Sequence, residues 1–148
     1  MFRVHIPALL VLLGLVSLSC QSYTTGLQKS VTRADETAAT GALHAIAVAQ
    51  QTYSATNGGD FGTFQQLTEG GYLDPRFNSS KPVIKDYVLT MEVTPKSAAQ
   101  AEPSYSCNAD PDPNGFKAGS HFYIDSTSSA LHVNPNASAT ARDPIAQP

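Results

Sequence analysis

Residues 32–53 read TRADETAATGALHAIAVAQQTY, and this stretch decides the fold. Apolar residues recur at spacings of three and four, which a helix of 3.6 residues per turn places on one side; they are Ala39, Leu43, Ile46, Ala49 and Tyr53. The opposite side carries polar residues, namely Thr37, Thr40, His44 and Gln51. Thr32, followed by Asp35 and Glu36, favours a helix start, and the Asn-Gly-Gly-Asp of residues 57–60 a stop. The pattern predicts an amphipathic helix that covers a core.

Strand patterns follow this helix. Residues 85–93 alternate, with apolar side chains on one side at Tyr87, Leu89, Met91 and Val93. A further strand is expected over residues 104–108, and a hairpin over 121–125 and 130–134 in which Phe122 faces Val133 and Tyr123 faces His132. Between the helix and the strands, Thr63 can cap a short helical turn that ends at residues 70–71. The order predicts an α+β fold, with the helix packed on an antiparallel sheet of three to four strands.

The composition excludes several classes of protein. A chain of 148 residues allows one domain. Its net charge of −3 excludes a sequence-independent nucleic-acid binder, which needs a basic face. Two cysteines are too few for a disulfide scaffold or a zinc ribbon. No Gly-x-Ser-x-Gly, His-Glu-x-x-His or phosphate-binding glycine loop occurs, so we expect no enzymatic activity.

The first twenty residues predict export. Residues 6–18 are almost wholly apolar, too short to span a membrane but typical of a signal peptide. They lead into Val-Ser-Leu-Ser-Cys20, which resembles a bacterial lipobox, although Ser17 stands where Leu is favoured. This predicts a signal peptide over residues 1–19 and a lipid-modified Cys20, with palmitate among the acyl chains; the alternative is an ordinary secretory cleavage before Cys20. Gln21 in place of Asp favours an outer-membrane lipoprotein.

The other cysteine then has no partner. Acylation of Cys20 would leave Cys107 as a single exported thiol, which is more often buried and inert than a nucleophile. We expect Cys107 to be buried. We further expect residues 20–32 to form a polar tether behind the lipid, and residues 135–148, which have no apolar stripe, to be a disordered tail.

Several segments of residues 33–134 match one family in order and spacing. The helical stretch from Glu36 to Tyr53 is followed by FQQL at residues 64–67 and GYLD at 71–74, and later by YSCNADP at 105–111 and HFYID at 121–125. Together they resemble the globular head of type IV pilins and type II secretion pseudopilins. The resemblance implies a pilin-like head, with protein partners in a pilus or secretion assembly.

The N-terminal segment departs from that family. A pilin begins with a short basic leader and then about twenty apolar residues that both span the membrane and bundle inside the filament, whereas here polar residues follow Cys20. We therefore expect a pilin head on a lipid anchor rather than a filament subunit.

Two groups of residues suggest metal ligands. Asp110, Asp112 and Asn114, followed by Gly115, copy the opening of a calcium-binding EF-hand loop, and some pseudopilins bind calcium near this position. The alternative is a plain turn, because His121 stands where the loop needs a bidentate Glu. His121, His132 and Asp125 of the predicted hairpin could ligate a transition metal, or be solvated strand residues.

Three functional classes follow from these features. The first is an exported, membrane-anchored, non-catalytic interaction module in the cell envelope. The second is an ion- or small-ligand-binding lipoprotein that uses the loop from Asp110 to Gly115 or the strand face of His121 and His132. The third, an enzyme that uses Cys107 or a histidine, has the least support.

Overall fold

The computed structural model describes residues 6–97, 102–115 and 119–147, with side chains from residue 26 onward. The chain divides into two compact units, residues 1–34 and 35–148. The element order is α1 (Ile6–Thr56), α2 (Phe64–Glu69), the 3₁₀ turn η1 (Pro75–Phe77) and the strands β1 (Val83–Ile84), β2 (Tyr87–Thr94), β3 (Ser104–Pro111), β4 (His121–Asp125) and β5 (His132–Asn134). The fold is α+β, as predicted.

The predicted start of the first helix is wrong. The helix begins at Ile6 rather than at Thr32, whose hydroxyl donates a hydrogen bond to the Gln28 carbonyl within the helix (3.0 Å). The expected tether over residues 20–32 is thus helical. The two residues of this stretch that could interrupt a helix do not do so, because Pro7 lies in the first turn, where it breaks no helical hydrogen bond, and Gly26 costs only about 1 kcal/mol in a helix interior. In the described part of the chain, no helix is long and apolar enough to cross a membrane. Cys20 lies within α1, and its side chain is outside the described ones.

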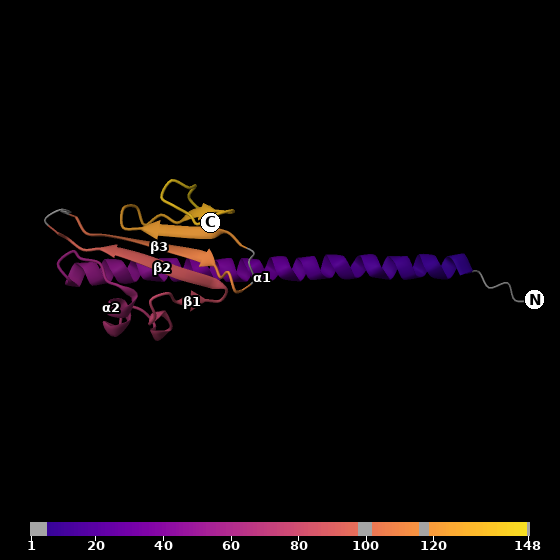
Figure 1. The fold of residues 1–148 in the computed structure, drawn as a ribbon, viewed down its shortest axis with the longest axis horizontal. Helices are drawn as coiled ribbons and strands as arrows, with labels where there is room; N and C mark the ends of the chain where they lie inside the picture. Colours follow the sequence, from indigo (N-terminus) through magenta and orange to yellow (C-terminus); the bar gives the residue numbers. More distant parts are fainter. Residues whose placement is uncertain (1–5, 98–101, 116–118, 148) are drawn as a thin grey trace, which may run out of the picture. The chain divides into compact units, whose positions relative to one another are not determined.

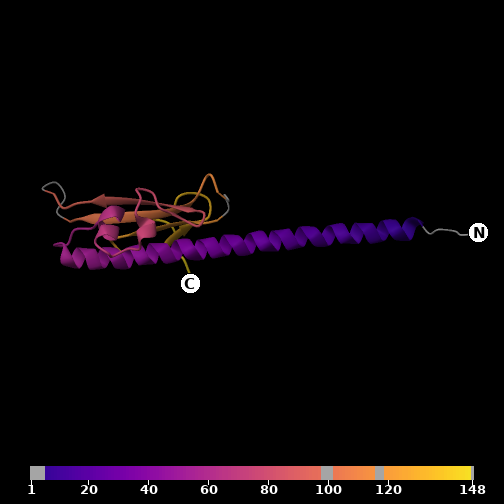
Figure 2. The same ribbon diagram turned by 90° about the horizontal axis from the view of Figure 1, so that it is seen from below.

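The apolar stripe of residues 39–53 packs on the sheet as predicted. Ala39, Leu43, Ile46 and Ala49 are buried in the same core as Leu89 of β2, Cys107 of β3 and Ile124 of β4. Figure 2 shows this part of α1 running along one face of the sheet. His44 and Gln51 on the other side of the helix are exposed. Burial of the apolar side chains, at about 25 cal/mol per Å² of apolar surface, is the main force that holds the helix on the sheet.

The sheet is an antiparallel meander of five strands in the order β1-β2-β3-β4-β5 (Figure 1). The extra strand is β1, which pairs with β2 through a two-residue turn at Lys85 and Asp86, with Ile84 opposite Tyr87. Lys85 adopts a positive φ of 54° there, a conformation usually given to Asn or Gly. The sequence therefore carried no turn signal at this place, and the predicted three to four strands were too few.

The remaining strands lie close to their predicted positions. In the β4–β5 hairpin, Phe122 pairs with Val133 and Tyr123 with His132, which confirms the predicted register. β3 runs on to Pro111, three residues past its predicted end, because Asp110 and Pro111 pair with Val88 and Tyr87 of β2. The predicted Thr63 cap is also confirmed, since its hydroxyl accepts a hydrogen bond from the Gln66 amide (3.3 Å).

A hydrogen-bonded contact fixes the chain just before β4. The Ser120 amide donates to Glu36 Oε1 of α1 (2.8 Å), and the Tyr87 hydroxyl donates to the Ser120 carbonyl (2.9 Å). Gly119 has a positive φ of 143°, and a Cβ there would collide with the Tyr87 hydroxyl. Burial, and next the charge of Glu36, raise the pKa of Tyr87 above its ordinary value. These bonds tie the backbone at Ser120 to α1 and β2, and so fix the point at which β4 begins.

Candidate functional site

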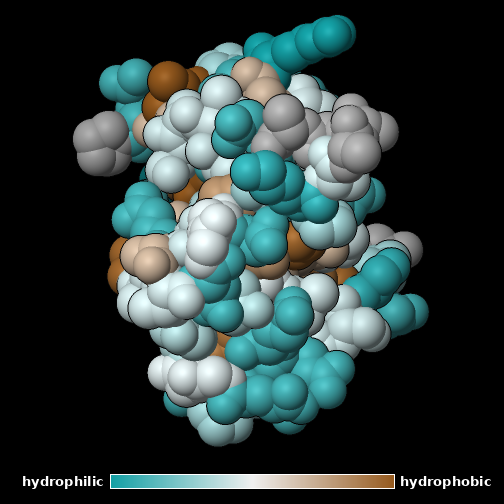
Figure 3. Space-filling model, turned by 90° about the vertical axis from the view of Figure 1, so that its left-hand side faces the viewer, coloured by the Kyte–Doolittle hydropathy of each residue, from teal (hydrophilic) through white to brown (hydrophobic). Residues whose placement is uncertain are grey.

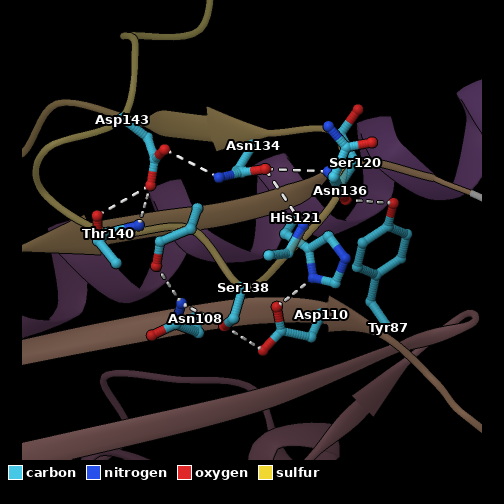
Figure 4. Close-up of polar contacts among 12 residues, drawn as sticks. Tyr87, Asn108, Asp110, Ser120, His121, Asn134, Asn136, Ser138, Thr140 and Asp143 are labelled. Carbon is cyan, nitrogen blue, oxygen red and sulfur yellow. Dashed lines mark hydrogen bonds and ion pairs between the residues drawn. The ribbon is translucent and has the colours of Figure 1, made fainter.

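Polar side chains form rows across the face of the sheet opposite α1. Strand pairing places Asn108, Tyr123 and His132 in one row. In the next row His121 of β4 pairs with Asn134 of β5, and its side chain contacts Asp110 of β3. The rows arise because alternate residues of a strand point to the same face and neighbouring strands are in register. Figure 4 shows the row of Asp110 and His121 and the segment that covers it. We take this polar cluster as the candidate site.

The Asp110 carboxylate is the centre of the cluster. Its Oδ1 lies 2.6 Å from His121 Nδ1, and its Oδ2 accepts a hydrogen bond from the Ser138 hydroxyl (2.9 Å). Both carboxylate oxygens are thus engaged within the chain. The side chains of Asp110 and His121 remain 31% and 22% exposed, so solvent screens the pair and limits its contribution to stability.

The segment after β5 lies on this face and is not a disordered tail. The Asn108 side-chain amide donates to the Ala139 carbonyl (2.7 Å), and Ala139 is only 2% exposed. Asp143 accepts hydrogen bonds from the amide and hydroxyl of Thr140 (2.7 and 2.9 Å) and from the Asn134 side chain (2.9 Å). The Thr140 amide and then its hydroxyl lower the pKa of Asp143.

The same segment also pairs with the outer edge of β5. The Val133 amide donates to the Pro144 carbonyl (2.9 Å), and the Ala146 amide donates to the Leu131 carbonyl (2.8 Å). His132 donates from Nδ1 to the Asp143 carbonyl (2.6 Å), and it is 9% exposed rather than solvated. The prediction of disorder was wrong because polar hydrogen bonds hold this segment in place. Such bonds leave no regular spacing of apolar residues in the sequence from which packing could be predicted.

The cluster does not have the geometry of a catalytic triad. A triad needs its serine bonded to the imidazole nitrogen remote from the carboxylate. Here Ser138 donates to Asp110, and in the described part of the chain no hydrogen bond joins it to His121. Cys107 is fully buried, as predicted, and burial followed by the charge of Asp110 raises the pKa of its thiol. A raised pKa removes the thiolate that nucleophilic chemistry requires.

In the structure the predicted calcium ligands Asp110 and Asp112 are engaged in separate hydrogen bonds within the chain. Asp110 is bonded to His121 and Ser138, whereas Asp112 accepts a hydrogen bond from the Asn114 amide (2.8 Å) within a turn. This is the turn geometry that was the alternative expectation. Among the described residues, no group of three or more His, Cys, Asp and Glu side chains is placed to hold a metal ion.

The second predicted ligand group is also dispersed. His121 bonds to Asp110 and His132 to the Asp143 carbonyl, as described above. Asp125 accepts hydrogen bonds from the Thr127 amide (2.8 Å) and from the Tyr123 hydroxyl (3.1 Å). Each side chain therefore serves a different local contact.

Sequence reasoning missed the three residues through which the segment after β5 joins the cluster: Ser138, Thr140 and Asp143. The spacing Thr140-x-x-Asp143 was an available signal, because short polar side chains three residues apart often close a local turn. Comparison with known proteins adds nothing to this description, since no family model, no curated protein and no solved structure matches the chain.

Proposed function

We propose that this protein is an exported, membrane-anchored and non-catalytic module with a pilin-like head, which acts by binding other proteins of the cell envelope. The observation that carries the proposal is the packing of the residue 39–49 stripe of α1 on one face of an antiparallel meander. That arrangement is what the resemblance to pilin and pseudopilin heads implies, and a pilus or secretion assembly is accordingly the proposed setting.

The polar cluster supports a structural rather than a catalytic role. Asp110 and His121 bond to each other, and Asp110 and Asn108 bond to the segment after β5. Groups used in this way hold the fold together and have little capacity left for a substrate. The coloured surface in the view of Figure 3 is mostly hydrophilic, with small separate hydrophobic spots.

The proposed anchor is a lipid on Cys20. Residues 20–30 read CQSYTTGLQKS, in which Tyr23 and Leu27 are the large apolar residues. A filament core built from bundled helices needs a long continuous apolar surface, so we propose that the protein stays at the membrane and does not polymerise. Burial of acyl chains in the membrane contributes about 0.8 kcal/mol of binding free energy per methylene group, which is enough for stable retention when more than one chain is attached.

The test is acylation of the full chain expressed in a diderm bacterium. With labelled palmitate in the medium, we expect label on the wild-type protein and partition into the detergent phase. Cys20→Ala should lose both, whereas Cys107→Ala, a matched loss of a cysteine, should keep both. Equal labelling and retention of Cys20→Ala and wild type would contradict the proposed anchor.

A further inference from the structure

A groove runs along the side of α1 within residues 35–148. It consists of two hollows of about 620 and 510 Å³, which lie next to each other along the helix and have Arg76 in both walls. α1 supplies one wall through small side chains, among them Ala38, Gly41, Ala45 and Ala49. The facing wall comes from residues 71–77 and 83–85.

Each hollow contains an exposed apolar side chain. Val48 is 64% exposed and lines the first hollow, and Val83 is 51% exposed and lines the second. The polar cluster on the sheet uses neither of them. Together with the small residues of α1 they give each hollow an apolar part, so a partner that entered the groove would bury both valines.

The charges of the groove are mostly basic. Arg76 lines both hollows and Lys85 lines the second, while Asp74 is the single carboxylate among the lining residues and accepts a hydrogen bond from the Arg76 amide (2.9 Å). The Arg76 guanidinium lies over the Phe77 ring, 5.1 Å from its centroid, which restrains it at the wall.

These cations stand out against the charge of their surroundings. All 12 acidic residues of the chain lie after position 34, whereas Arg3, Lys29 and Arg33 precede it. The unit of residues 35–148 is therefore acidic as a whole, and a basic groove in it is electrostatically distinct. Such local contrast selects partners of opposite charge and disfavours like-charged ones.

We propose that this groove binds an acidic, amphipathic peptide segment of a partner protein. The inference rests on the proposed role as an interaction module and names the kind of partner. A concave groove with one wall of small residues accommodates a helix or an extended segment, whereas a membrane surface is flat. From Ala38 to Thr52, α1 rises by about 21 Å, which corresponds to roughly 14 residues of a docked helix. Glutamates at the edge of that segment would face Arg76 and Lys85.

The test is a fluorescence titration of the full chain in detergent. The probe is a labelled 14-residue peptide with leucine at one helical face and glutamate elsewhere, and its control carries lysine at the glutamate positions. We expect saturable binding of the glutamate peptide and affinity about tenfold lower for the lysine peptide. Arg76→Glu combined with Lys85→Glu should weaken the glutamate peptide about tenfold and reverse the preference.

Matched variants complete the design. Lys96→Glu with Arg142→Glu changes the net charge equally outside the groove and should leave the affinity unchanged. Val48→Asp, at an exposed helix position, should weaken binding without reversing the preference. It provides a second test of the groove if the Arg76→Glu, Lys85→Glu variant fails to fold. The proposal would be overturned if the glutamate peptide did not bind, or if both peptides bound equally. It would also be overturned if the two double variants had equal effects, or if the protein bound phosphatidylglycerol vesicles and neither peptide. Because Cys20 takes no part in this titration, its result is independent of the anchor.

Discussion

At the scale of single residues, Gln50 shows how one polar side chain can fix a loop. It lies within the buried face of α1 and is fully buried. Its Oε1 accepts a hydrogen bond from the Gly62 amide (2.9 Å), and its Nε2 donates to the Gly62 carbonyl (2.6 Å). Gly62 follows the end of α1 by six residues, so this double bond holds the connection between α1 and α2 against the core.

Replacement of Gln50 by Leu should destabilise the protein. The variant leaves the Gly62 amide and carbonyl buried without partners, at about 1–3 kcal/mol for each group. We expect the free energy of unfolding in urea to fall by about 2–6 kcal/mol. Gln51→Leu, one position along on the exposed side, should change it by less than about 0.5 kcal/mol. Similar effects at the two positions would show that the Gly62 bonds contribute little.

The buried tyrosines predict sensitivity to alkali. Burial is the main cause that raises the pKa of Tyr105 to about 12, above its ordinary value of 10.0. Between these values the unfolded chain loses the Tyr105 proton while the native chain keeps it, so stability present below pH 10 falls as the pH rises toward 12. The free energy of unfolding in urea can be measured at pH 9, 10 and 11 for the wild type and for Tyr105→Phe. We expect it to fall less steeply with pH in the variant, by at most about 1.4 kcal/mol per pH unit. An unchanged slope would contradict the assignment.

At the scale of secondary-structure elements, local patterns decided which parts of the fold could be predicted. The stripe of α1, the Thr63 cap and the β4–β5 register were foreseeable because each follows from a regular pattern within one helix, one turn or one hairpin. Gln50 was not foreseeable, since its partner lies 12 residues away in a loop. Nor was β1, because Lys85 and Asp86 do not carry the usual signal of a tight turn.

The helix stripe can be tested with one buried and one exposed substitution. Ile46 is fully buried in the core, so Ile46→Asp would place a charge without a partner among methyl groups. We expect that change to cost several kcal/mol against a total of about 5–15, and so to abolish the cooperative thermal transition. His44→Asp, on the exposed side, should keep the transition close to its wild-type temperature. Equal loss in both variants would reject the assigned helix face.

At the scale of the whole molecule, the candidate site forms where segments that are far apart in the sequence come into contact. The hairpin half of the cluster was predicted, because β4 and β5 are neighbours in sequence. Asp110 and Ser138 are 28 residues apart, and no local pattern indicated that they meet. In that contact Asp110 fastens the C-terminal segment to the sheet, and His121 is the partner of Asp110 on β4.

The central claim is that the protein works as a membrane-held module and not as a filament subunit. Its most direct test is the distribution of the full chain, expressed at native level, between a sheared surface-fibre fraction and the membrane fraction. The account predicts that the protein stays with the membranes and is released by detergent, because the segment after Cys20 has too little apolar surface to form a filament core. Recovery of the protein as a stoichiometric component of purified filaments would contradict the account.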